Sequence, residues 1–136
     1  MNVLVAGDDI RFRHFVRRAL VAHFGCAVTE AGNGREALLG LERDRFDLMV
    51  VEDAMPVMGG HDMLRELRAS TPFTTMPVVI LNGDPDEGMV RQAIDLGVLD
   101  YLLTTQRAPY QFVERMGRVF ERIGPACLTA PAPPAG

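Results

Sequence analysis

The chain has 136 residues, a formal net charge of −4 at pH 7 and 48% hydrophobic residues, which suits one domain around one core. The net negative charge gives no electrostatic reason to expect nucleic-acid binding, and no apolar run approaches the roughly 18 residues of a membrane span. All fourteen basic side chains are arginine, which excludes any mechanism that needs a catalytic lysine.

Short apolar runs alternate with stretches of helical period. The first half of the chain predicts strands at 3–6, 26–29 and 48–51, and helices at 12–24, after Asn33-Gly34 and around 63–67. The run at 48–51 is uniformly apolar, as a parallel strand covered on both faces should be.

The second half continues the pattern from a strand at 78–81. Asp84 is a suitable N-cap and is followed by proline at the first helical position, so we expect a helix from there to about Leu96, with Gly97 at its end. A strand at 100–103 and a helix at about 109–123 follow. Five β/α units predict an α/β fold, with a doubly wound, flavodoxin-like, five-stranded parallel sheet and function at the carboxyl ends of the strands.

The composition changes near Gly124. Residues 125–136 are rich in proline and alanine and carry no core-forming pattern, so we expect a flexible tail or linker after one domain at 1–124. The first residues are strand-like and contain no basic n-region or cleavage site, so we do not expect secretion. Two cysteines are too few for a disulfide framework, so we expect a reduced, cytoplasmic setting.

The most specific pattern is the segment 50–60, Val-Val-Glu-Asp-Ala-Met-Pro-Val-Met-Gly-Gly. It resembles the phosphoacceptor segment of response-regulator receiver domains, in which an aspartate closes the strand four residues before the proline. The resemblance covers about residues 2–123 and implies a phosphorelay signalling module rather than an enzyme. Glu52 stands at the acceptor position. Asp53 as the acceptor would break the spacing to Pro56 and aim its side chain at the opposite face of the sheet.

Glutamate at the acceptor position changes the expected chemistry. The extra methylene of Glu52 moves the nucleophilic oxygen by roughly an ångström, and a misplacement of that size can cost about a hundredfold in rate. The same methylene carries a fixed negative charge toward the place of a phosphoryl group. Glu52 therefore either imitates a modified aspartate in part, or has drifted at a site that is no longer used.

The acids that close the first strand in the family are incomplete here. Gly7 stands at the first acidic position and Asp8 at the second, and Asp9 follows. The resemblance implies that any Mg²⁺ rests on Asp8, with Asp9 and Glu52 as weak ligands, and we expect no cofactor to be required. The alternative for the two aspartates is a solvated strand end that caps the first helix.

Three residues stand at the switch positions of the family. Asn82 replaces the usual hydroxyl residue, and it either holds the Glu52 carboxylate or caps the turn after the fourth strand. Thr104 replaces the lysine that pairs with phosphate and offers a neutral hydrogen bond of about half the strength. Tyr101 matches the aromatic residue whose rotamer reports activation, and half-buried packing is its alternative role.

Basic residues on the first helix suggest a partner surface. Arg11, Arg17 and Arg18 lie beside the predicted site, where receivers commonly contact a phosphotransfer partner, and a solvated charged face is the alternative. Leu99 stands near the face of the fourth helix, fifth strand and fifth helix, which the family uses for dimers and outputs. The expected partners are a histidine kinase, a phosphotransfer protein or an effector protein, with a homodimer through that second face.

Three functions compete. We favour a receiver-like, pseudo-receiver module that acts through protein–protein contact and independently of phosphorylation. The first alternative is a genuine phosphoacceptor receiver with a degraded site. The second is an unrelated flavodoxin-like enzyme or nucleotide binder, but a glycine-rich phosphate loop and a nucleophile–base pair are both missing. The three histidines are scattered and are interpreted as surface or packing residues: His14, His23 and His61.

Overall fold

The computed structural model describes residues 1–69, 75–103 and 109–123. Five strands form one parallel sheet in the order β2-β1-β3-β4-β5: β1 (Asn2–Ala6), β2 (Ala27–Ala31), β3 (Leu48–Glu52), β4 (Val78–Asn82) and β5 (Asp100–Leu103). The helices between and after them are α1 (Ile10–Phe24), α2 (Gly34–Arg43), α3 (Gly60–Arg68), α4 (Glu87–Asp95) and α5 (Pro109–Ile123). This topology confirms the predicted doubly wound fold.

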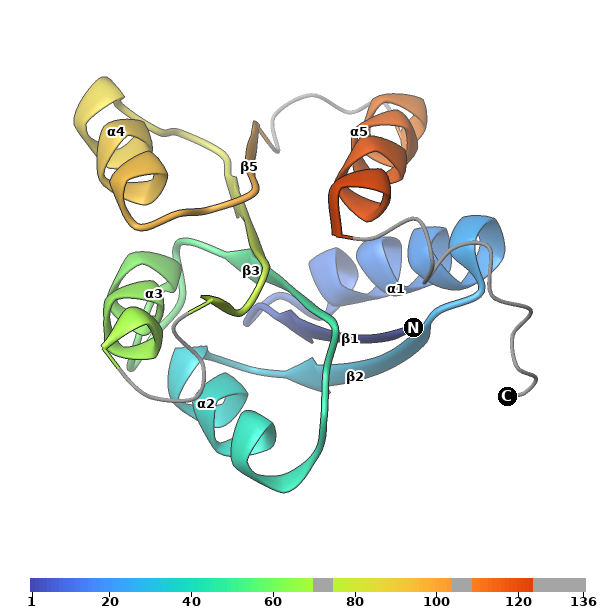
Figure 1. The fold of residues 1–136 in the computed structure, drawn as a ribbon, viewed down its shortest axis with the longest axis horizontal. Helices are drawn as coiled ribbons and strands as arrows, with labels where there is room; N and C mark the ends of the chain where they lie inside the picture. The colour runs from blue at the N-terminus through green and yellow to red at the C-terminus, as the bar shows by residue number, and fades with distance from the viewer. Residues whose placement is uncertain (70–74, 104–108, 124–136) are drawn as a thin grey trace.

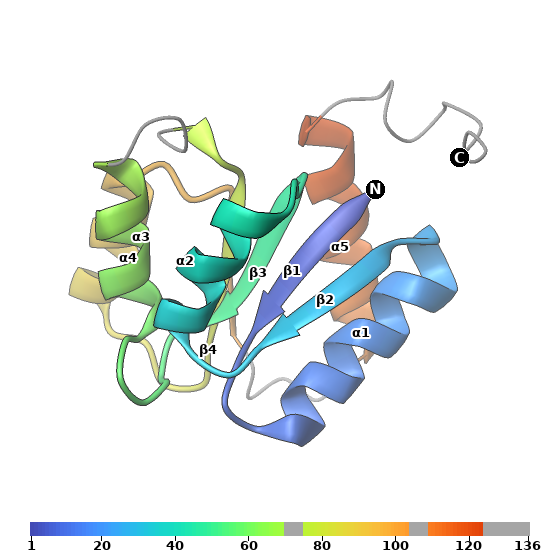
Figure 2. The same ribbon diagram turned by 90° about the horizontal axis from the view of Figure 1, so that it is seen from below.

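The helices cover both faces of the sheet (Figure 1). Helices α1 and α5 pack on one face, and α2, α3 and α4 pack on the other, as the view from below shows most clearly (Figure 2). Alternate side chains of β1 serve the two sides: Val3 and Val5 join the core under α1 and α5, whereas Leu4 and Ala6 join the core under the other three helices. Because the chain winds in opposite directions from β1, the ends of β1 and β3 open on one crevice.

Most element boundaries follow from local signals. Asn33 caps α2 by accepting a hydrogen bond from the backbone N–H of Glu36 at 2.9 Å. Gly97 follows α4 with a φ of 77°, a left-handed conformation that favours glycine. Strand β2 begins one residue later than predicted and ends at Ala31, because its register pairs Ala27 with Asn2.

The predicted start of α4 at Asp84 is wrong. The helix begins at Glu87, and Asp86 is its N-cap, accepting a hydrogen bond from the backbone N–H of Met89 at 2.8 Å. The backbone N–H of Asp84 is already bonded to the side chain of Asn82 at 3.0 Å. The bond to Asn82 keeps Asp84 in the turn after β4, so Asp86 caps the helix instead.

Two predictions fall on residues that the structure does not describe, namely the tail at 125–136 and the role of Thr104. Among the described helices, none combines the length and apolar character that crossing a membrane requires.

Candidate functional site

The crevice between β1 and β3 is filled by protein side chains. Glu52 closes β3, and its Oε1 lies 3.0 Å from the place where a Cβ on Gly7 would stand. The ring of Phe12, from the first turn of α1, comes even closer to that place, with Cδ2 at 2.5 Å. The missing side chain of Gly7 thus leaves room that an aromatic ring and the longer acid occupy together.

The Glu52 carboxyl sits in an unfavourable environment for a charge. Its Oε1 is buried and finds no hydrogen-bond partner among the residues that the structure describes. The pKa of Glu52 is raised from 4.5 to about 6, mainly by burial and also by the nearby carboxylates of Asp8 and Asp9, while a backbone hydrogen bond from Asp8 opposes the shift. At the acceptor position, therefore, a proton competes for the oxygen that would have to act as nucleophile.

This raised pKa predicts a distinctive dependence of stability on pH. Folded Glu52 keeps its proton to higher pH than the unfolded glutamate, so its contribution is fully present below pH 4.5 and is lost as the pH rises through about 6. We expect the free energy of unfolding to fall by about 1 kcal/mol more in the parent than in Glu52→Gln between pH 4.5 and about pH 7, after allowing for solvent screening.

Urea unfolding of the parent and Glu52→Gln across this pH range measures the difference. Glu42→Gln, which removes an exposed glutamate from α2, is the matched control. Identical pH profiles for the parent and Glu52→Gln would show that the Glu52 carboxyl is ionised to the same extent in the folded and unfolded chains.

A second carboxylate, Asp53, lies next to Glu52 and is buried. Its Oδ1 accepts a hydrogen bond from the backbone N–H of His61 at 3.0 Å and lies 2.7 Å from Nδ1 of the same residue. Its Oδ2 accepts a hydrogen bond from Nδ2 of Asn82 at 3.0 Å, and the same amide donates to Oη of Tyr101 at 2.9 Å. Burial is also the main cause that raises the pKa of Tyr101.

The possibility that Asn82 holds the Glu52 carboxylate is wrong, and its turn-capping alternative is correct. The register explains the outcome. Glu52 pairs with Leu81, so the next positions, Asp53 and Asn82, lie side by side and point to the opposite face of the sheet from Glu52. As expected, the Asp53 side chain points away from the acceptor side chain. The hydrogen bonds that it makes there could not be predicted from its sequence position alone.

His61 is the residue that sequence reasoning missed. It was interpreted as a surface or packing residue, but its side chain is only 12% exposed and both ring nitrogens face hydrogen-bonding atoms. One signal was present in the sequence: a polar ring follows Gly59-Gly60 at the start of a helix, eight residues after Asp53.

The Mg²⁺ ligands that the resemblance implied are only partly available in the structure, and Mg²⁺ binding stays a prediction. Asp8 is exposed, and the Asp9 side chain already caps α1 by accepting from the backbone N–H of Arg11 at 2.8 Å. Across residues 1–69, 75–103 and 109–123, no three His, Cys, Asp or Glu side chains converge as metal ligands. Magnesium takes oxygen ligands in near-octahedral geometry, and the Phe12 ring lies where the first family acid would point.

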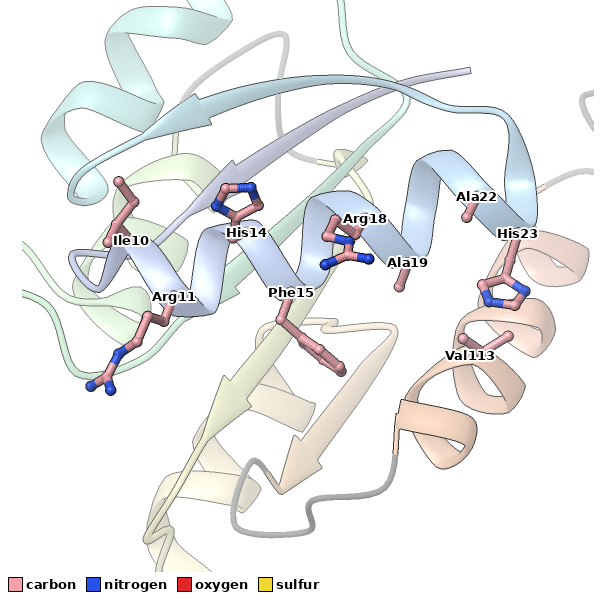
Figure 3. A pocket seen from close by; sticks show the side chains of 9 residues that line it. All are labelled: Ile10, Arg11, His14, Phe15, Arg18, Ala19, Ala22, His23 and Val113. Carbon is pink, nitrogen blue, oxygen red and sulfur yellow. The ribbon is translucent and has the colours of Figure 1, made fainter.

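The residues predicted to form the partner surface do not all lie together in the structure. A groove of about 690 Å³ runs along α1 toward α5. Figure 3 shows Phe15 pointing from α1 across this groove, with Arg11 and Arg18 on the same helix. The groove is lined by Ile10, Arg11, His14, Phe15, Arg18, Ala19, Ala22, His23 and Val113.

Two of the expected surface residues take other roles. Arg17 donates to Glu30 of β2 at 2.8 Å and thereby joins α1 to the sheet rather than lining the groove. Leu99, which we expected near the face used for dimers and outputs, is partly buried and packs against the core. Among the residues that the structure describes, Ile94 and Leu103 are the large apolar side chains exposed on that side of the molecule.

Comparisons with known proteins agree with this geometry. The family model "Response regulator receiver domain" matches residues 3–109. Two-component response regulator ORR12 of Oryza sativa subsp. japonica is 36% identical over 103 residues, which are 75% of this chain and 84% of the relative. Chemotaxis protein CheY of Pseudomonas aeruginosa is 28% identical over 90% of this chain and 98% of the relative. The solved structure of Vibrio cholerae CheY4 matches with a TM-score of 0.78 and 26% identity, covering 87% and 97% of the two chains.

Proposed function

Because the chain belongs to the response-regulator receiver domain family, we propose that it is a two-component signalling module that acts through protein–protein contact and without phosphorylation. One observation carries the proposal. Glu52 and Phe12 fill the crevice beside Gly7 in which a receiver holds its acceptor carboxylate and metal. Family membership also removes the unrelated flavodoxin-like enzyme from the alternatives.

Three features of the site oppose phosphoryl transfer to Glu52. The Oε1 oxygen is buried, so a phosphodonor has poor access to it as folded. The chain contains no lysine to pair with a transferred phosphoryl group. Asp53 is no substitute, because it is 8% exposed and both of its oxygens accept hydrogen bonds from other residues.

The groove on α1 is the surface that we propose for partner contact. Ile10 and Phe15 are 64% and 39% exposed, and Arg11 and Arg18 are the cationic side chains beside them. Apolar anchors next to arginines suit an amphipathic helix with acidic residues along its edge. A partner of this chemistry fits the expected classes, which are a histidine kinase, a phosphotransfer protein or an effector protein. The homodimer through α4, β5 and α5 stays a prediction.

Labelling with a small phosphodonor tests the proposal. Intact-mass analysis after incubation with phosphoramidate and Mg²⁺ is expected to show no added phosphoryl group, which would weigh about 80 Da. We expect Glu52→Asp to stay unlabelled as well, because Gly7 still supplies no metal ligand. A mass shift on the parent that is lost in Glu52→Ala would overturn the proposal and establish the phosphoacceptor alternative.

A further inference from the structure

The ring of His61 joins the end of β3 to α4. His61 stands in the first turn of α3, and its Nδ1 lies 2.7 Å from Oδ1 of Asp53. On the other side of the ring, Nε2 lies 2.8 Å from the backbone carbonyl oxygen of Met89, in the first turn of α4. The side chains of His61 and Asp53 are only 12% and 7% exposed, so water competes little for these bonds.

The hydrogen-bonding groups of Met89 and Asp53 determine which hydrogen bonds the His61 ring makes. A carbonyl oxygen only accepts hydrogen bonds, so Nε2 donates to Met89. The Asp53 carboxylate accepts as well, so the contact is complete when Nδ1 also carries a proton. A ring that donates from both nitrogens neutralises a buried carboxylate and fixes the position of α4 with the same two bonds.

The other oxygen of Asp53 extends the same network across the sheet. It holds the Asn82 amide, whose second proton goes to Tyr101. The orientation of that amide is fixed, because its oxygen accepts from the backbone N–H of Asp84. One buried carboxylate is therefore bonded to side chains from α3, β4 and, through Asn82, β5, and it lies on the opposite face of the sheet from Glu52.

We propose that Asp53 and His61 form a latch that holds α4 and Tyr101 in one position whatever the state of Glu52. Asn82 and Tyr101 occupy the switch positions of the domain, but their hydrogen bonds lead to Asp53, and Glu52 has no bond to either. The inference rests on the proposed function, because a module that works without phosphorylation needs its α4–β5 side set by its own residues.

Amide hydrogen exchange of the full chain tests the latch. In His61→Ala we expect the amides of α4 to exchange about tenfold faster than in the parent, while the amides of α1 keep their rates. Asp53→Asn is a second, nearly isosteric variant with the same expected effect, and it serves if His61→Ala does not fold. The matched control is His23→Ala, an exposed histidine at the end of α1, which is expected to leave α4 unchanged.

The outcomes separate the latch from the proposed function. Rates in α4 within twofold of the parent, in a folded His61→Ala or Asp53→Asn, overturn the latch. Glu52→Gln is expected to leave the α4 rates unchanged, and an acceleration like that of His61→Ala overturns the claim that the latch is independent of Glu52. If the parent does accept a phosphoryl group, the proposed function fails, but unchanged α4 rates in the labelled protein still support the latch.

Discussion

Gly59→Ala is expected to lower the free energy of unfolding by about 3 kcal/mol. A methyl group on Gly59 would stand 2.6 Å from the backbone carbonyl oxygen of Asp53, which is closer than real contacts of this kind allow. Rotation of a side chain cannot relieve the clash, because the Cβ position is fixed by the backbone and the carbonyl oxygen belongs to it. The same carbonyl accepts a hydrogen bond from the N–H of Gly60 at 3.0 Å, so moving it also disturbs the start of α3.

Urea unfolding of Gly59→Ala and Gly117→Ala measures this effect against a matched control. Gly117 lies within α5, where the nearest atom to an added Cβ is Cε1 of Phe24 at 3.9 Å. The same substitution there is expected to stabilise the fold by about 0.5–1 kcal/mol, since alanine is the better helix former. A loss below about 1 kcal/mol in Gly59→Ala would show that the turn relaxes freely around the new methyl group.

Restoring an acid at position 7 is expected to destabilise the protein by about 2–3 kcal/mol. In Gly7→Asp the new Cβ would meet Cδ2 and Cε2 of Phe12 at 2.5 and 2.7 Å, so the ring must move. The new carboxylate would also lie near those of Asp8 and Asp9, which already raise the pKa of Glu52. The acid that other receivers carry is thus incompatible with the side chains around this glycine.

A double-mutant cycle with Phe12→Ala separates the two causes. Removing the ring relieves the steric part, so we expect the cost of Gly7→Asp to fall by about 1–2 kcal/mol in the Phe12→Ala background. Gly7→Ala adds the Cβ without the charge, so we expect its cost in stability to equal the steric part of the cost of Gly7→Asp. Equal costs of Gly7→Asp in both backgrounds would mean that like-charge repulsion, and not Phe12, excludes an acid from this position.

Much of the fold could be predicted because its signals are local. The uniformly apolar run in β3 and the Asn33 cap of α2 each specify an element within a few residues. The start of α4 could not be predicted in this way, because Asp84 and Asp86 are equally good caps by type. The choice between them depends on Asn82, whose side chain engages the first of the two.

The acceptor position was predictable, but its surroundings were not. Spacing to Pro56 is enough to place Glu52 at the end of β3. The raised pKa of Glu52 depends on burial beside Phe12, and that depends on how a side chain of α1 turns toward the sheet. The contact of His61 with Met89 joins two helices that are far apart in the sequence, so no short pattern contains it.

Because alternate β1 side chains pack into two cores, substitutions on the two faces of the sheet affect different sets of neighbours. The groove of α1 lies over the core that contains Val3 and Val5, whereas the Asp53–His61 latch lies on the side of Leu4 and Ala6. Substitutions on the two sides share few neighbours, so their effects on stability should add. The proposed partner surface on α1 is therefore free to diversify, or to be redesigned, without disturbing the proposed latch.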